Sequence, residues 1–337
     1  MCSVQRVYQI HVMYNNSSFF AANIEPDTLS KVVAGISIAT GTTSVIGNGL
    51  VILVMRQKCG KHSLFKCLLV HLAICDLLFA ILQFADVPTW LEMKWVYGRV
   101  LCKIIPPSQL LVSLAAEGTI VVIAIERFKG ISNPLNCEWT KKKMILGLII
   151  SWLLAGISVI PYLVVIKVIY IYNDPQCVED WGEEAIYDKE KPLIYSLYLF
   201  ICSFVFPMFI LAFLYGKIIL ILRKPKLNNQ EISGLLEKRR KKDIRVTKLL
   251  VAVVLAFVVC VLPNHVGHII SLTVDNLTMT GAKIVHYVTL IPYPFHCTIN
   301  PFIYSIVDVK FRNDVKRFLQ RKRTMKSSSS RRTASLL

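Results

Sequence analysis

The chain has 337 residues, of which 54% are hydrophobic and only 18% are charged, and its mean hydropathy is +0.54. A soluble chain of this length would form one or two domains with its apolar residues in short periodic bursts. Here the apolar residues form blocks long enough to cross a bilayer, which takes about 20 residues of helix. Composition therefore excludes an ordinary soluble protein and indicates a membrane protein.

Seven apolar blocks predict seven transmembrane helices, so the expected fold is an all-α membrane protein with a seven-helix bundle. The blocks cover residues 32–55, 64–82, 104–125, 144–166, 192–222, 249–272 and 282–307. The last block is the weakest because it contains Pro292, Pro294 and Pro301, although neighbouring helices can satisfy the carbonyls that a proline frees. We expect the transmembrane domain to span residues 31–307, after an N-terminal segment, residues 1–30, in which no cleaved signal peptide is evident.

Lysine and arginine are concentrated on one side of the predicted bundle. The segments after the first, third, fifth and seventh helices hold most of them, whereas the segment between the fourth and fifth helices is strongly acidic. Cytoplasmic segments carry the excess of basic residues in membrane proteins, so we predict an extracellular N-terminus and a cytoplasmic C-terminus at the plasma membrane. Contact with the lipid bilayer then explains the net charge of +18, and nucleic acid is not an expected partner.

Two further features agree with this orientation. Asn15, Asn16 and Asn276 begin Asn-x-Ser or Asn-x-Thr sequons in predicted extracellular segments, where glycosylation is possible. Cys102 begins the third helix and Cys177 lies in the acidic segment, so that both face the oxidising side. We therefore predict a Cys102–Cys177 disulfide that holds the acidic segment over the mouth of the bundle.

Ionisable side chains occur inside several of the predicted helices. Because such groups are costly to hold in a bilayer, each is a candidate functional site. They are Asp76, Glu117, Glu126, Arg127, His265, His268, His286 and His296. Arg127 follows Cys102 by 25 residues, about 37 Å of helix, which puts it at the cytoplasmic end, whereas Glu117 lies near mid-membrane.

These side chains predict neither an enzyme nor a metal or cofactor site. An intramembrane hydrolase needs a paired nucleophile and base, a carboxylate dyad or a metal triad, and the sequence offers none at the required spacing. A transporter is the remote alternative. It would be expected to show an internal repeat with interrupted helices in matching positions, and seven helices do not divide into two halves.

Short motifs in successive helices carry a family resemblance. The first helix contains "GNGLV", the second "HLAICD", and the approach to the third reads "WVYGRVLC". The third helix ends in "ERF", the sixth contains "FVVCVLP" and the seventh contains "NPFIY". In this order and spacing, the motifs resemble the rhodopsin-like (class A) family of G-protein-coupled receptors over nearly the whole chain. The resemblance implies a receptor that activates a heterotrimeric G protein.

The resemblance also implies a conformational switch at the cytoplasmic end. Arg127 would pair with Glu126 and, at rest, with Asp243, which lies about 30 Å along the sixth helix from Pro263. Breaking that pair would release the sixth helix outward about Pro263 and open a groove for a helix of the G protein. Further expected members of the switch are Asp76, Glu117, Tyr215, Phe257, Asn300, Pro301 and Tyr304. The alternative for Arg127 is an arginine that only snorkels to the interface.

Glu117 departs from most of this family, whose members carry an apolar residue between Pro207 and Phe257 at this position. Within the neuropeptide-receptor branch, this acid is similar to one in receptors for the pyroglutamylated RFamide peptide. The stretches "PPSQLLVSLAAE" and "CVEDW" also resemble those receptors. Two interpretations stay open for Glu117: a protonated core acid held by hydrogen bonds, or a relay linked to pH or to the ligand.

The ligand that the resemblance implies is a C-terminally amidated neuropeptide of the RFamide type. Gln109 occupies the position where amine receptors carry an aspartate, and its amide can both donate to and accept from a carboxamide. The carboxylates expected to capture the ligand's arginine are Asp86, Glu179 and Asp180. Aromatic contacts would come from Trp95, Trp181, His268, His286 and Tyr287. The alternatives are a satisfied buried glutamine and a solvated acidic loop.

Several positions depart from the family pattern. Val261 stands where the family usually carries a tryptophan that relays ligand contact. Ala116, His296 and Cys297 replace groups common in the family's sodium pocket, so we predict no sodium binding. These departures motivate a rival interpretation, in which the chain is a constitutively active, decoy or partner-type receptor without a peptide agonist of its own.

The C-terminal segment falls into two parts. Residues 308–320 predict a short amphipathic helix on the membrane surface, with Phe311, Val315, Phe318 and Leu319 on its apolar face. Residues 321–337 predict a disordered cytoplasmic tail, whose serines could recruit receptor kinases and arrestin. The alternative is a tail that only adds solubility.

Overall fold

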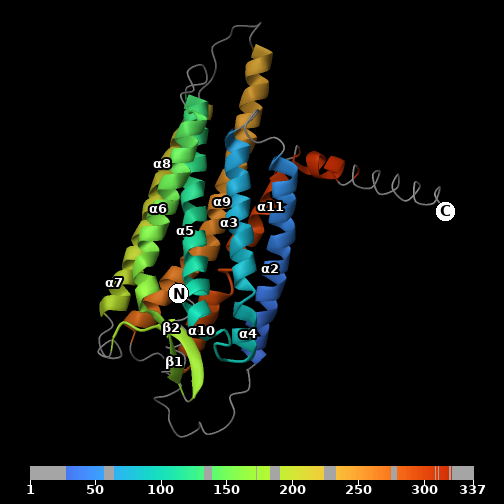
Figure 1. Cartoon of the computed structure of the whole chain (residues 1–337). Helices are drawn as coiled ribbons and strands as arrows, with labels where there is room; N and C mark the ends of the chain where they lie inside the picture. Colours follow the sequence, from blue (N-terminus) through green and yellow to red (C-terminus); the bar gives the residue numbers. More distant parts are fainter. Residues whose placement is uncertain are drawn as a thin grey trace, which may run out of the picture.

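The structure is a computed structural model that describes residues 28–56, 64–132, 139–171, 173–182, 190–223, 233–274, 279–307, 309, 311–318 and 320. Long helices run side by side in one bundle (Figure 1). A hairpin of two strands lies across one end of the bundle, and the first turns of α9 project from the other (Figure 1). The two ends therefore differ in structure, and each holds a separate candidate site.

The first six crossings of the bundle are long helices. The first four are α2 (Thr28–Met55), α3 (Leu64–Gln83), α5 (Gly98–Ser132) and α6 (Lys141–Val165), with the short α4 (Asp86–Leu91) after α3. The fifth comprises α7 (Glu190–Leu199), η3 (Phe200–Val205) and α8 (Phe206–Arg223), and the sixth is α9 (Ser233–Thr273). By length and composition, 6 of the described helical segments could span a membrane.

A proline accounts for the irregular turn in the fifth crossing. In the π-helical stretch η3, the N–H of Phe206 donates to the carbonyl of Ile201. Pro207 follows directly and has no N–H with which to continue the α-helical pattern. The wider turn is therefore a local response to one residue, and α8 continues the crossing beyond it.

The seventh crossing is divided in two. It consists of α10 (Met279–Leu290) and α11 (Phe295–Val307), which are joined by a turn over residues 291–294. Pro292 and Pro294 lie in that turn, and α11 begins where the N–H of Phe295 donates to the Pro292 carbonyl at 3.0 Å. The sequence predicted one block over 282–307, and the two prolines are the reason that it is broken here.

Two helices extend beyond their apolar blocks. α5 begins at Gly98 and ends at Ser132, whereas its predicted block covered 104–125. α9 begins at Ser233, well before residue 249, and its added turns are rich in lysine and arginine. These residues favour a helix as strongly as leucine does, but they do not favour lipid. The apolar pattern therefore marks the membrane rather than the ends of the helices.

The acidic segment begins with a hairpin that the sequence did not predict. β1 (Ile166–Ile171) pairs antiparallel with β2 (Asp174–Glu179), and Ile166 lies opposite Glu179. The predicted disulfide between Cys177 of β2 and Cys102 of α5 is confirmed, with the two Cα atoms 5.6 Å apart. The N–H of Trp95 also donates to the Pro175 carbonyl at 2.7 Å. These contacts hold the hairpin across the end of the bundle (Figure 1).

Small residues allow the helices to approach closely, and large ones cover the outside. A Cβ on Gly118 of α5 would lie 2.7 Å from the Cβ of Ser151 on α6, so the two helices can approach this closely only because glycine has no side chain. Close approach at small residues is typical of membrane helix pairs. Phe209 and Ile306 point outward and are 73% and 75% exposed. An apolar surface of this extent indicates contact with lipid.

A short helix follows the seventh crossing. Residues 311–318 are helical, and the buried ring of Phe311 contacts the ring of Tyr304 with centroids 6.3 Å apart. Val315 and Phe318 also pack against the core of the bundle. The position of this helix on the membrane surface stays a prediction. The side chain of Leu319 and the tail over residues 321–337 lie outside the described residues.

Candidate functional site

A cavity of about 100 Å³ lies at the hairpin end of the bundle. Every crossing but the fifth contributes to its lining, as do α4 and β2. The polar side chains in its wall include Gln83, Asp86, Thr89, Gln109 and Asn264, and the aromatic ones include Phe79, Trp90, Trp95, Tyr162 and Tyr293. Concave sites with aromatic walls and a few convergent polar groups are typical of ligand-binding sites.

Gln109 and Asp86 meet in the wall of this cavity. The Nε2 of Gln109 on α5 donates to Asp86 Oδ2 at 3.0 Å and to the Leu82 carbonyl at 3.2 Å. α4 begins at Asp86, so the bend that ends α3 carries this carboxylate to the cavity. With both N–H groups of Gln109 engaged, its side-chain oxygen is the atom that can accept a hydrogen bond from a ligand.

Polar contacts tie three crossings together deeper in the bundle. Asn300 of α11 donates to Asp76 Oδ2 of α3 at 2.8 Å. Asn48 of α2 donates to the carbonyl of Cys297 at 2.9 Å. Buried polar groups need such partners because leaving them unpaired is costly. These bonds therefore hold α2, α3 and α11 in one arrangement.

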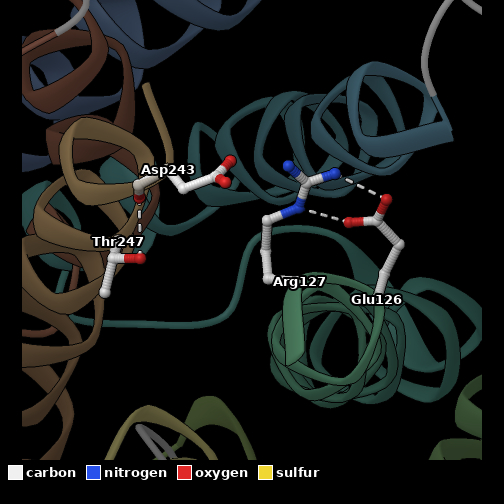
Figure 2. Close-up of polar contacts among 4 residues, drawn as sticks. All are labelled: Glu126, Arg127, Asp243 and Thr247. Atoms are coloured by element: carbon white, nitrogen blue, oxygen red, sulfur yellow. Dashed lines mark hydrogen bonds and ion pairs between the residues drawn. The ribbon is translucent and has the colours of Figure 1, made fainter. Parts of the chain in front are cut away.

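Arg127 is held by its sequence neighbour at the other end of the bundle. Its Nη2 donates to Glu126 Oε1 at 2.5 Å, its Nε donates to Glu126 Oε2, and its guanidinium lies 4.2 Å from the centroid of the Phe65 ring. The Asp243 carboxylate on α9 faces the guanidinium (Figure 2), but the two groups are not within the 4.0 Å of an ion pair among the described residues. Glu126 is thus the carboxylate that neutralises Arg127 in this structure.

Two tyrosine hydroxyls near this end are buried without a partner. Among the described residues, neither the hydroxyl of Tyr215 on α8 nor that of Tyr304 on α11 has a hydrogen-bond partner. An unsatisfied buried hydroxyl costs free energy. A rearrangement that gave either tyrosine a partner would therefore be favoured, which is a property expected of a bistable element.

The profile of the family described as "7 transmembrane receptor (rhodopsin family)" matches residues 47–304 of the chain. The chain belongs to this family. The match confirms the resemblance, the seven-helix membrane fold and the prediction that the chain is not an enzyme. The receptor is a multi-pass membrane protein, and α10 with α11 forms its seventh helix.

Similar proteins include receptors of several kinds. The human urotensin-2 receptor is 25% identical over 311 residues, covering 89% of this chain and 76% of that receptor. The rat neuropeptide Y receptor type 4 is 24% identical over 305 residues, covering 86% and 79%. The rat pyroglutamylated RF-amide peptide receptor is 27% identical over 299 residues, covering 80% and 66%. At this distance, the relatives define the family but not the ligand of this receptor.

The structure divides the predicted carboxylates of the receptor into two groups. Asp86 lines the cavity, whereas Glu179 and Asp180 do not. Asp180 accepts from Lys167 at 2.8 Å and from the Gly182 N–H at 2.9 Å, and the lysine holds the pKa of this carboxyl below its usual value. Glu179 accepts from Trp181 Nε1 at 3.1 Å. These two acids therefore bind within the hairpin segment instead of facing the cavity.

The predicted aromatic residues are divided in the same way. Trp95 lines the cavity, but Trp181 packs against Tyr195, and His268 and Tyr287 are not part of the cavity wall. The side chain of His286 and the residues Asn15, Asn16 and Asn276 lie outside the described part of the chain. Sequence reasoning missed Trp90, Asn264 and Tyr293 as wall residues. Trp90 could have been predicted, because it follows Asp86 by four residues and residues at this spacing share a helix face.

The remaining predicted switch residues lie where the helices can bend or move. Pro263 is inside α9, Pro301 is inside α11, and Phe257 is buried with its ring stacked on Phe204 at 6.2 Å between centroids. Glu117 is buried in the middle of α5. Their roles in activation remain predictions.

Proposed function

We propose that this receptor lies in the plasma membrane with its hairpin end outside, binds a C-terminally amidated peptide of the RFamide type, and activates a heterotrimeric G protein. The observation that carries the proposal is the hydrogen bond between Gln109 and Asp86 in the wall of an aromatic cavity. A carboxylate and an amide side by side match the guanidinium and the carboxamide of an Arg-Phe-amide terminus.

The two polar groups of such a C-terminus, the guanidinium and the carboxamide, fit different wall residues. The Asp86 carboxylate would accept two N–H bonds from a guanidinium, which is the strongest pairing available to arginine. The Gln109 oxygen, whose N–H groups are engaged by Asp86 and Leu82, would accept from the carboxamide N–H₂. A free carboxylic acid has no N–H to offer and would meet the negative charge of Asp86. The amide should therefore be preferred over the acid.

The names of the relatives support a peptide as the ligand class. They include receptors for urotensin-2, neuropeptide Y and the pyroglutamylated RF-amide peptide. The aromatic residues Trp90 and Trp95 are buried in the cavity wall and would contact the phenylalanine ring of the ligand. The cavity lies next to the disulfide-bonded hairpin, which supports an extracellular location because disulfides persist on the oxidising side.

The opposite end supports coupling to a G protein. The first turns of α9 carry most of its lysine and arginine, in keeping with the cytoplasmic side. Outward movement of α9 would separate Asp243 from the α5 end that carries Arg127, and would leave a groove for a helix of the partner. Glycosylation at Asn15, Asn16 and Asn276, and recruitment of receptor kinases and arrestin by the tail, belong to the same proposal.

A receptor that signals without a peptide is the second candidate. Two observations favour it: Val261 replaces the usual tryptophan, and Arg127 and Asp243 do not form an ion pair in the described structure. Such a receptor would show a raised basal signal that Arg127→Ala abolishes. A peptide-dependent receptor would instead show a low basal signal.

The experiment compares amidated Arg-Phe peptides with their free acids, by calcium and cyclic-AMP responses in cells that express the receptor. We expect the acid to be at least tenfold weaker. Asp86→Asn should lower potency roughly tenfold or more, as expected for losing a hydrogen bond to a charged group, and Gln109→Ala should also lower it. Glu179→Gln, outside the cavity, is the matched control and should stay within about threefold. Silence across the panel at normal surface expression would overturn the peptide proposal.

A further inference from the structure

Val261 leaves the centre of the bundle open to polar side chains. It is 1% exposed and lines a cavity of about 10 Å³, together with Ser113, Glu117, His265 and Tyr293. This volume corresponds to about one water molecule. An indole at residue 261, which the family usually carries there, would occupy much more of this space. The valine thus changes which groups can connect the ligand cavity with the core.

A hydrogen-bonded path enters this region from the ligand cavity. Tyr293 lines both the ligand cavity and the small cavity beside Val261. Its hydroxyl donates to Ser113 Oγ at 3.2 Å. Ser113 and Glu117 follow one another by one turn of α5, and both line the small cavity. A serine can accept one bond while it donates another, so Ser113 can link Tyr293 to Glu117 across this cavity.

Glu117 connects this path to a second cavity that α3 and α11 line. Its side chain lines the cavity beside Val261 and also a second cavity of about 10 Å³, which Asp76 and Asn300 line from α3 and α11. Glu117 is only 8% exposed, and among the described residues its Oε2 has no hydrogen-bond partner. A buried carboxyl oxygen beside a polar, water-sized cavity is suited to a bond through one water.

We propose that the polar file Tyr293–Ser113–Glu117–Asp76 carries the ligand signal from the extracellular cavity to α11, in place of the indole that Val261 lacks. The last step is the bond from Asn300 to Asp76, which joins the file to the helix that carries Tyr304. Signal transfer by a ligand rests on the proposed function, but the file itself does not depend on which peptide binds.

The physical basis is that buried polar side chains around shared, water-sized cavities have few acceptable arrangements. A ligand that moves Tyr293 would break its bond to Ser113 and leave buried polar groups unpaired, which is costly. Ser113 and Glu117 would then adopt other partners, and the arrangement of Asp76 and Asn300 would change with them. Tyr293 and Ser113 are therefore positioning residues, whose hydroxyls matter more than their volumes.

The test uses Tyr293→Phe, Ser113→Ala and Glu117→Leu in the full receptor, with the synthetic Arg-Phe-amide peptides as the probe. Energy transfer between receptor and G protein in cells is read without and with peptide, and peptide affinity is measured separately. Each variant should lower the maximal response roughly three- to tenfold, as expected for one buried hydrogen bond. Affinity should change by less than about threefold in Ser113→Ala and Glu117→Leu, because neither residue lines the ligand cavity.

Three comparisons distinguish a relay from a structural role. Ser113→Ala combined with Tyr293→Phe should lower the response no further than the larger single effect, because both break one chain. Glu117→Gln, which keeps a hydrogen-bonding side chain, should restore part of the response lost in Glu117→Leu. Ser151→Ala is the matched control and should stay within about twofold of wild type. Among the described residues, the Ser151 hydroxyl bonds only the Gly147 carbonyl of its own helix, at 2.9 Å.

Each result has a defined meaning. Three results would overturn the relay and leave the peptide receptor intact. They are unchanged peptide signalling in Glu117→Leu, additive losses in the double variant, or affinity that falls in parallel with the response in Ser113→Ala and Glu117→Leu. If the wild type responds to none of the peptides, the proposed ligand fails. The relay is then judged on basal energy transfer, which should shift severalfold in Glu117→Leu and recover in Glu117→Gln; an unchanged basal value would overturn it.

Discussion

Asp180 forms an ion pair with Lys167, with 2.8 Å between Nζ and Oδ2. The pair joins β1 to the residue after β2 and so closes the open end of the hairpin. Hydrogen bonding from Lys167 lowers the pKa of Asp180, the Gly182 N–H acts in the same direction, and burial opposes both. Since the folded pKa lies below the unfolded one, the pair stabilises the hairpin at neutral pH and is lost only as pH falls through the lowered value.

We therefore predict that hairpin stability is flat between pH 8 and 5, because an ordinary aspartate titrates near about 3.9. Asp180→Asn should raise amide hydrogen exchange in β1 and β2 at pH 7, by up to roughly fivefold for an exposed pair worth about 0.2–1 kcal/mol. Asp174→Asn, at the other end of the same hairpin and outside this pair, is the control. A protection factor, corrected for the intrinsic exchange rate at each pH, that falls between pH 8 and 5 in the wild type would contradict the assignment.

Single residues were predicted unevenly from the sequence. Gln109 and Asp86 were expected to bind ligand, and both line the cavity. Glu179 and Asp180 were expected there too, because they lie beside Cys177, but the pairing of β2 with β1 directs them to Trp181 and Lys167. Spacing along a helix can be read from sequence, whereas the direction of a side chain in an unexpected hairpin depends on its strand partner.

The contact between α5 and α6 depends on the absence of a side chain at Gly118. A Cβ added there would lie 2.7 Å from both Cβ and Oγ of Ser151 and 3.4 Å from its Cα. The Cβ of Ser151 is fixed to the backbone of α6 and cannot swing aside, so α6 itself would have to move. We predict that Gly118→Ala lowers stability by about 1–3 kcal/mol, the usual cost of overpacking.

The measurement is the thermal midpoint of the purified receptor in detergent. Gly156→Ala, in α6 with nothing within 4 Å of the added Cβ, is the control and should raise the midpoint, because alanine stabilises a helix by about 0.5–1 kcal/mol over glycine. Ser151→Gly should recover part of the loss in Gly118→Ala. Equal shifts in Gly118→Ala and Gly156→Ala would show that the close approach of α5 and α6 is not limiting.

Helices were easier to predict than their ends. Hydropathy located the crossings because the bilayer imposes a minimum apolar length. It missed the first turns of α9, since Lys and Arg extend a helix outside lipid as readily as leucine does inside. It also predicted α10 and α11 as one helix, because hydropathy counts proline as apolar and takes no account of its missing N–H group.

Opening of the bundle at the end opposite the hairpin would depend on what holds Arg127. Glu126 makes two bonds to it, whereas Asp243 faces it without an ion pair (Figure 2). We predict that Glu126→Gln raises basal G-protein activation by roughly fivefold or more, since hydrogen bonds to charged groups are worth about 1.5–3 kcal/mol. Asp243→Asn should leave it within about twofold of wild type.

Energy transfer between receptor and G protein without ligand measures both variants at matched surface expression. Arg127→Ala is the second control and should abolish the basal signal in either background. A larger effect of Asp243→Asn than of Glu126→Gln would mean that the helix-to-helix pair, and not the pair within α5, restrains the receptor.

The sequence by itself determined the family, the number of crossings, the disulfide and the residue types at both candidate sites. These follow from local rules: apolar length, the side on which Lys and Arg gather, and motifs whose members lie close together along one helix. Only the tertiary structure decided which side chains meet. It joined Gln109 to Asp86, Tyr293 to Ser113, and Asn300 to Asp76, because contacts between residues far apart in the chain depend on how the helices pack, and no spacing rule within one helix contains that information.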